Sequence, residues 1–316
     1  MSMMRNSKLT VVGAGSVGSS LAYAALIRNS ARHVALYDIN EPKVTAEVLD
    51  LGHGTPFVGS SSITGGADIS VTAGSDVVVI TAGAAQKPGQ TRLELAGINA
   101  NILREMMPEL VRLSPDAVFI LVTNPCDVLT VIADDMAGLP AGRVFSSGTV
   151  LDSARLRWLV AEAAGVAPAN VHAIVMGEHG DSEFPLWSSA TIGQVPLSEW
   201  ESASGHRMFS RDHLEQLTQD VSRAAYRIIE GKGATNYAIG LSGARIVEAI
   251  IRNEQAILPV SSVLRGYRGI EGIALSVPSV VGAGGVQRQL EVPMDEREVE
   301  LLHASAATLR ASLAHI

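Results

Sequence analysis

A short strand that runs through a glycine-rich turn into a helix constrains the fold of this chain more than any other feature of its sequence. The β-branched run at residues 10–12 predicts a buried strand, and the small residues at 19–27 predict a helix. Between them, residues 13–18 read Gly-Ala-Gly-Ser-Val-Gly. The spacing G-x-G-x-x-G in a strand–turn–helix setting is typical of dinucleotide-binding sites.

Each glycine of this turn would have its own physical role. Gly13 permits the tight turn, Gly15 lets the backbone approach a pyrophosphate, and Gly18 lets the helix lie close to the strand. The amides at the N-terminus of the helix would then face the phosphates.

An acidic residue follows the turn at the spacing that a nucleotide site requires. Asp38 ends the next expected strand, twenty residues after Gly18. A carboxylate there can accept both hydroxyls of the adenosine ribose and would repel the 2′-phosphate of NADP, so these residues predict NAD as the cofactor. The same residues would also be explained if Asp38 only capped the next helix and Gly18 only packed its helix against the strand.

Strands and helices alternate through the first half of the chain, which predicts an α/β fold with a Rossmann doubly wound parallel sheet. The expected strands are 10–12, 33–38, 76–81 and 117–122, and the expected helices are 19–27, 41–51 and 91–113, with short polar segments at 59–74. We therefore assign residues 1–148 to an NAD-binding Rossmann domain.

The pattern changes past about residue 148, which predicts a mixed α+β substrate domain over residues 149–316. We expect a helix from near Leu151, strands at 170–176, 256–264 and 272–281, and helices at 211–230, 234–253 and 295–314.

Composition excludes several classes of function. The formal net charge of −8 and the pI near 5.5 argue against a nucleic-acid partner. No apolar stretch reaches membrane-spanning length, and residues 1–8 lack the apolar core of a signal peptide. The single cysteine, Cys126, fits a reducing cytosol, and no Cys/His spacing suits a metal. We expect a cytoplasmic protein in which Cys126 is a buried, inert thiol.

Hydride transfer to a 2-oxo acid would leave an alkoxide that needs a general acid, and His179 is the best candidate. Gly177 and Gly180 bracket it, which suits an exposed loop at the end of a strand. Asp152 and Arg155 are three positions apart on one face of an expected helix. They predict either a surface ion pair, or an aspartate that orients a histidine beside an arginine that binds a carboxylate.

Five segments in the same order resemble the bacterial type of L-lactate dehydrogenase, within the lactate/malate dehydrogenase superfamily. They are the glycine turn, TAGAAQKPGQTR at residues 81–92, VTNPCD at 122–127, GTVLDSAR at 148–155 and GEHGDS at 177–182. The resemblance runs end to end. Several of these segments are shared with malate dehydrogenases, so they indicate the fold and the reaction type more firmly than the substrate.

The resemblance implies roles for individual residues. His179 would be the proton donor and acceptor with Asp152 holding it, Arg155 would bind the substrate carboxylate, and Arg92 would polarise the reacting carbonyl. The glycine-punctuated loop at residues 83–92 would then close over the substrate, although an ordinary surface loop would have the same composition.

The resemblance also implies contacts with the substrate and the cofactor. Asn124 would touch both the substrate and the nicotinamide ribose, Thr235 would line the substrate pocket, and Ile239 would offer an apolar face to the nicotinamide. Further contacts with NAD would come from Val17, Lys43, Gly83, Ala84, Val122 and Ser147, in addition to Gly13, Gly15, Gly18 and Asp38.

Gln86 matches the position that faces the far end of the substrate in such enzymes, where malate-type relatives carry an arginine. Burying a second substrate carboxylate beside a neutral glutamine would cost several kcal/mol, which favours pyruvate and lactate over oxaloacetate and malate. A malate or broad 2-oxo acid dehydrogenase is the alternative within the class. A non-catalytic NAD-binding sensor is the alternative of another class.

Arg157 lies roughly 200° around the helix from Arg155, so it faces elsewhere. With His172 it matches the positions where many bacterial relatives bind fructose 1,6-bisphosphate at a subunit interface. The resemblance therefore implies an activated homo-oligomer, expected to be a tetramer. An ordinary surface arginine and strand histidine would explain the same two residues.

Overall fold

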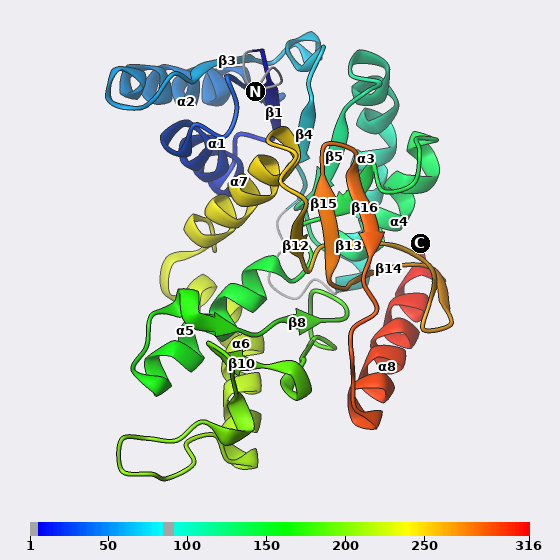
Figure 1. Cartoon of the computed structure of the whole chain (residues 1–316). Helices are drawn as coiled ribbons and strands as arrows, with labels where there is room; N and C mark the ends of the chain where they lie inside the picture. The colour runs from blue at the N-terminus through cyan, green and yellow to red at the C-terminus, as the bar shows by residue number, and fades with distance from the viewer. Residues whose placement is uncertain (1–5, 85–91) are drawn as a thin grey trace.

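The computed structural model describes residues 6–84 and 92–316, without the side chains of residues 92 and 93, and places eight strands in one sheet (Figure 1). These strands are β1 (Lys8–Val12), β2 (His33–Tyr37), β3 (Ser62–Gly66), β4 (Val77–Ile80), β5 (Val118–Leu121), β6 (Val144–Ser146), β13 (Ser261–Tyr267) and β14 (Ile270–Ser276). Their order is β14-β13-β6-β5-β4-β1-β2-β3. Strands β1 to β6 are parallel, as in a doubly wound fold, and β13 and β14 extend the sheet as antiparallel strands.

Successive side chains of the parallel strands point to opposite faces of this sheet, and both faces are buried. Val77 and Val79 belong to a core shared with α1 (Ser16–Arg28) and α7 (Tyr237–Ile251). Val78 and Ile80 belong to the core of the opposite face, shared with α3 (Arg92–Leu113) and α4 (Cys126–Ala137). Figure 1 shows the two pairs of helices on opposite sides of the strands, with α2 (Glu41–Gly54) beside α1.

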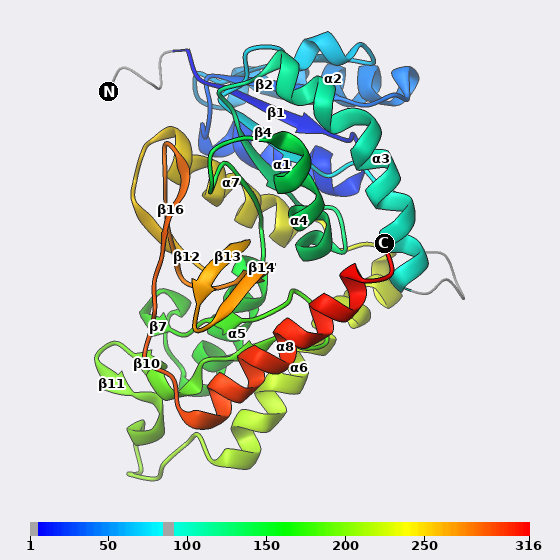
Figure 2. The same ribbon diagram turned by 90° about the vertical axis from the view of Figure 1, so that its right-hand side faces the viewer.

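The second half of the chain builds smaller sheets and three further helices. One sheet contains β7 (Val171–His172), β10 (Thr191–Ile192) and β11 (Val195–Pro196). A second contains β12 (Ala256–Leu258), β15 (Ser279–Gly282) and β16 (Gly285–Gln289), and a third pairs β8 (Val175–Met176) with β9 (Phe184–Pro185). The helices are α5 (Val150–Ala164), α6 (Arg211–Lys232) and α8 (Glu296–Leu313). Helix α8, red in Figure 2, packs Leu302 and Leu309 into a core with Leu275 of β14. None of the helices in the described part combines the length and apolar character that crossing a membrane requires.

The structure corrects several expected element boundaries. The expected strands 256–264 and 272–281 are each divided, at Pro259 and Pro278, because proline has no N–H to donate to a strand ladder. The expected strand 170–176 is two short strands, β7 and β8. The polar segment 59–74 contains β3, an edge strand whose Ser-Ile-Thr-Gly-Gly sequence has only one large apolar residue.

The crossing of α1 and α7 depends on glycine, and this gives a prediction about stability. A Cβ on Gly240 would lie 2.8 Å from the Ser20 backbone oxygen, so there is no room for one. We expect Gly240→Ala to lower the free energy of unfolding by about 1–3 kcal/mol, measured by urea denaturation. The matched control is Gly97→Ala in α3, where a Cβ would meet no atom within 4 Å and the helix would gain up to ~1 kcal/mol. Equal urea midpoints for Gly240→Ala and the wild type would contradict the argument.

Candidate active site

The glycine turn connects β1 to α1 at the carboxyl edge of the sheet. Gly13 has φ +107°, and a Cβ there would lie 2.7 Å from the Ala82 backbone nitrogen. A Cβ on Gly18 would lie 1.8 Å from the Gly13 oxygen, so only glycine allows this close packing. A Cβ on Gly15, in contrast, would meet nothing within 4 Å. The turn is therefore tightly packed behind and open at Gly15, which fits a backbone cradle for a pyrophosphate.

Asp38 lies at the end of β2, directly beside the turn. Its Oδ2 accepts a hydrogen bond of 2.7 Å from the Ala14 N–H, and its Oδ1 accepts one of 2.9 Å from the Asn40 N–H. The half-exposed carboxylate is thus held by backbone donors next to the turn, where it can also accept ribose hydroxyls. Val17 is half-buried in the first turn of α1, and Lys43 is exposed in the first turn of α2.

Loops that follow adjacent strands converge at the same edge. Gly83 and Ala84 follow β4, Val122 and Asn124 follow β5, and Ser147 follows β6. The Ser147 N–H donates to the Leu121 oxygen at 3.0 Å, which keeps the last two loops together. This convergence at the carboxyl ends of parallel strands is where ligands bind in open α/β sheets.

Asn99, which the sequence analysis missed, joins two of these loops. Its Oδ1 accepts a 2.7 Å hydrogen bond from the Ala84 N–H, and its Nδ2 donates to the Asn124 oxygen at 2.8 Å. Asn99 is 2% exposed, on the face of α3 that also buries Ala96, Ala100 and Leu103. A polar residue within an apolar helical stripe was the signal that could have identified it.

His179, Asp152 and Arg155 form one hydrogen-bonded cluster. His179 Nδ1 lies 2.6 Å from Asp152 Oδ2, and Arg155 Nη1 lies 2.6 Å from Asp152 Oδ1. Asp152 is 1% exposed in the first turn of α5, whereas the His179 side chain keeps 25% of its surface exposed. A proton on Nδ1 would point at the carboxylate, which leaves Nε2 as the nitrogen that can exchange a proton with a ligand.

Two further carboxyl groups contact this histidine, and neither was singled out from the sequence. Asp127, buried in the first turn of α4, accepts a hydrogen bond of 2.6 Å from the His179 backbone N–H through Oδ2. Glu183 Oε2 lies 4.0 Å from His179 Nδ1. Two signals in the sequence could have identified them. Asp127 ends the segment VTNPCD, and Glu183 follows His179 by four residues.

The cluster shifts the protonation of its members strongly. Burial by itself would lower the pKa of His179, but the charge and hydrogen bond of Asp152, with the charges of Glu183 and Asp127, raise that pKa to about 9. Burial would raise the pKa of Asp152, but His179 and Arg155 hold it below its usual range. Burial raises the pKa of Asp127 to about 6. At neutral pH the cluster therefore presents an imidazolium that is paired with a buried carboxylate.

The remaining candidate residues divide into two groups. Thr235 is half-buried just before α7, where the neighbouring Asn236 donates to Ser20 of α1 at 2.8 Å, and Ile239 is buried in the first turn of α7. Gln86 lies outside the described residues, as does the side chain of Arg92.

Arg157 and His172 face a different part of the molecule from Arg155. Arg157 Nε donates to the Ala173 oxygen at 3.0 Å. Ala173 directly follows His172, which is exposed at the end of β7. The structure therefore places the two basic residues on neighbouring segments.

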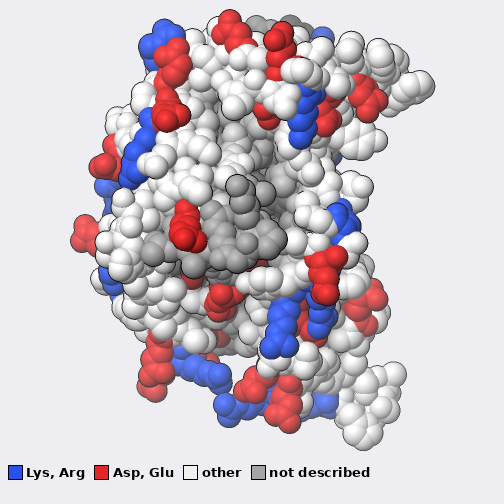
Figure 3. Space-filling view, turned by 180° about the vertical axis from the view of Figure 1, so that it is seen from behind, with Lys and Arg blue, Asp and Glu red and all other residues white. Residues whose placement is uncertain are grey.

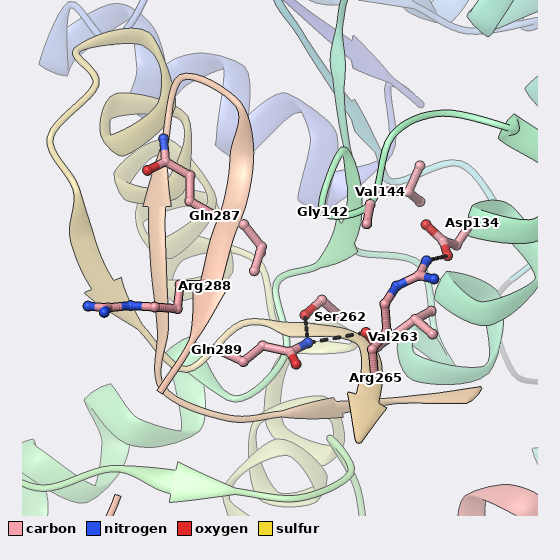
Figure 4. Close-up of a pocket in the computed structure, with 11 residues that line it drawn as sticks. Asp134, Gly142, Val144, Ser262, Val263, Arg265, Gln287, Arg288 and Gln289 are labelled. Carbon is pink, nitrogen blue, oxygen red and sulfur yellow. Dashed lines mark hydrogen bonds and ion pairs between the residues drawn. The ribbon is translucent and has the colours of Figure 1, made fainter. Parts of the chain in front are cut away.

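Other surface features lie apart from this site. The cavity in Figure 4, of about 170 Å³, is lined by residues of β6, β13 and β16 and by Asp134 of α4. Several of its polar groups are already paired: Gln289 donates to Ser262 Oγ and the Val263 oxygen, and Arg265 lies 3.5 Å from Asp134. On the face shown in Figure 3, basic and acidic side chains of the described residues are interspersed. That distribution is unlike the basic surface of a nucleic-acid-binding protein.

Comparison with known proteins agrees with the fold and with the order of these residues. Residues 7–146 match the family model of the lactate/malate dehydrogenase NAD binding domain, and residues 149–316 match that of the lactate/malate dehydrogenase alpha/beta C-terminal domain. An L-lactate dehydrogenase of Bifidobacterium animalis subsp. lactis is 50% identical over 99% of this chain and 98% of its own length. One of Thermoanaerobacter sp. is 43% identical over 96% of this chain and 97% of its own.

Solved structures give the same result. The minor L-lactate dehydrogenase of Enterococcus mundtii, in a ligand-bound form, superposes with a TM-score of 0.94 at 39% identity and covers 98% of each chain. A lactate dehydrogenase from a Medee basin deep-sea metagenome library gives a TM-score of 0.93 at 38% identity, with 99% of each chain covered. The chain belongs to the lactate/malate dehydrogenase family.

Proposed function

We propose that this protein is an NAD-dependent L-lactate dehydrogenase, which reversibly reduces pyruvate to (S)-lactate. The observation that carries the proposal is the shared carboxylate of Asp152, with His179 on one oxygen and Arg155 on the other, each at 2.6 Å. This arrangement holds a proton donor and a carboxylate-binding guanidinium side by side. The L-lactate dehydrogenases that are 43–50% identical to the chain support the same activity.

The described residues fit NAD. Gly13, Gly15 and Gly18 would hold the pyrophosphate through backbone amides, and Asp38 would accept the ribose hydroxyls. Further contacts would come from Val17, Lys43, Gly83, Ala84, Val122, Asn124, Ser147 and Ile239. The bound dinucleotide, in its reduced form, supplies the hydride.

The side chains of the site would orient the substrate and move its proton. Arg155 binds the carboxylate of pyruvate with the help of Asn124 and Thr235, and Arg92 polarises the carbonyl. His179 donates the proton on Nε2 to the carbonyl oxygen, and Asp152 stabilises the imidazolium before this transfer. Because the pKa of His179 is raised to about 9, the histidine is protonated at neutral pH and ready for reduction; oxidation of lactate needs its neutral form and is favoured as the pH rises.

The finer assignments form part of the same proposal. The NAD-binding domain spans residues 1–148 and the substrate domain residues 149–316. The protein works in the cytoplasm as a homotetramer. Fructose 1,6-bisphosphate activates it by binding Arg157 and His172 at a subunit interface, where two basic groups suit a phosphate.

The substrate preference gives the first prediction of this proposal. With purified protein and NADH, we expect kcat/KM for pyruvate to exceed that for oxaloacetate by about 100-fold, because Gln86 offers no charge to a second carboxylate. Gln86→Arg should reverse the preference, and Gln90→Arg in the same loop is the matched control. A wild-type preference for oxaloacetate would identify a malate-type enzyme. Absence of turnover with either substrate would favour an NAD-binding sensor.

The pairing of His179 with Asp152 gives the second prediction. Removing the carboxylate charge in Asp152→Asn should lower the pKa of His179 from about 9 by ~1–2 units, because burial then acts with less opposition. NMR titration of protein with ¹³C-labelled histidine measures this pKa, and the other histidines serve as internal references. A His179 titration curve that coincides with the wild-type curve would refute the proposed role of Asp152.

The effector site gives the third prediction. Replacing both Arg157 and His172 by glutamine should abolish the decrease in KM for pyruvate caused by fructose 1,6-bisphosphate and leave the maximal rate within about twofold. The matched control replaces the exposed Arg104 and His303 by glutamine. A full response in the Arg157/His172 double variant would place the effector elsewhere.

A further inference from the structure

A second carboxyl group lies beside the imidazole of His179, and the proposed mechanism does not use it. Glu183 precedes β9, and its side chain is 5% exposed. The facing atoms of Asp152, His179 and Glu183 all lie within 4.8 Å of one another. Two acidic side chains therefore face one edge of the ring on which the proton transfer depends.

We propose that Glu183 is a positioning residue that acts through His179: it exchanges its own proton at high pH and so extends the pH range in which His179 remains protonated. The inference rests on the proposed function, in which His179 supplies the proton. It concerns a residue that would touch neither the substrate nor the cofactor.

The charged groups around this pair come from three parts of the fold. Helix α5 contributes Asp152 and Arg155, helix α4 contributes Asp127, and the loop that carries His179 contributes Glu178. Burial and then the charge of Asp152 raise the pKa of Glu183 to about 9, while His179 and Arg155 act in the opposite direction. At neutral pH Glu183 is therefore an uncharged acid beside a charged Asp152.

The protonation of His179 and that of Glu183 are coupled because Glu183 is buried and lies close to the imidazole. As the pH rises, loss of the Glu183 proton creates a carboxylate 4.0 Å from Nδ1, which stabilises the imidazolium that remains. Without the carboxyl group of Glu183, no new carboxylate forms beside the imidazolium as the pH rises, and nothing further stabilises the protonated His179. The proton donor is then lost at a lower pH.

The test compares pH profiles of kcat/KM for pyruvate in the wild type and in Glu183→Gln, a variant that keeps the size of the side chain. We expect the basic limb of the variant to move down by about 0.5–1 pH unit, so that kcat/KM at pH 9 falls by roughly two- to fivefold. At pH 6.5 the two proteins should agree within about twofold, because Glu183 is uncharged there. A residue with only a packing role would lower activity equally at both pH values.

The matched control is Glu178→Gln, which removes another carboxyl group from the same loop, where Glu178 accepts a hydrogen bond from Ser182. Its basic limb should coincide with that of the wild type. A coincident limb in Glu183→Gln, or an equal shift in Glu178→Gln, overturns the inference. The wild-type rate with pyruvate tests the proposed function separately, so the two failures can be distinguished.

A second measurement keeps the inference testable if Glu183→Gln does not fold. Infrared spectra of wild-type protein with ¹³C-labelled glutamate should show the carbonyl stretch of a protonated carboxylic acid at pH 7, and this band should disappear as the pH rises through about 9. Glu183→Asp, which removes the label at this position, should lack the band. A wild-type spectrum without the band at pH 7 overturns the inference.

Discussion

The buried carboxylate of Asp152 is the interaction on which the arrangement of the site depends. Each of its oxygens binds one cationic partner at 2.6 Å, His179 on one side and Arg155 on the other. An unpaired charge at 1% exposure would be strongly destabilising, so the fold has to bring both partners to it. The same requirement places the proposed proton donor, His179, beside Arg155, the residue proposed to bind a carboxylate.

The parallel sheet provides the frame for this carboxylate. Helix α5 begins shortly after β6 and α4 shortly after β5, so Asp152 and Asp127 both lie in first turns of helices at the carboxyl edge. The loop of His179 is fixed to both helices, through its ring to α5 and through its backbone N–H to α4. The glycine turn after β1 opens at this same edge. The glycine turn and the His179 cluster therefore lie at the same edge of the sheet, because strand ends converge there.

Prediction from the sequence succeeded where the signal was local and failed where it was not. The buried parallel strands and most helices were identified from periodicity, whereas α4 and β6 were not assigned at all. Strand β6 has only three residues, which is too short for a periodic pattern, whereas α4 is a helix of 12 residues whose pattern after Pro125 the sequence analysis did not use. Strand β3 was missed because an edge strand needs few apolar residues, and its place becomes clear only from pairing with β2.

The sequence by itself determined the glycine turn, the acid at Asp38 and the common face of Asp152 and Arg155, because each depends on spacing within one turn or one pair of neighbouring elements. Only the tertiary structure decided which carboxyl groups surround His179. Asp152 is 27 positions away and Asp127 is 52, and Glu183 is close in sequence but becomes important through its burial. The pKa of His179 is raised because the charges of these carboxyl groups, with the hydrogen bond to Asp152, outweigh the burial that would lower it. Distances of this kind depend on how the helices pack on the sheet, which local periodicity does not specify.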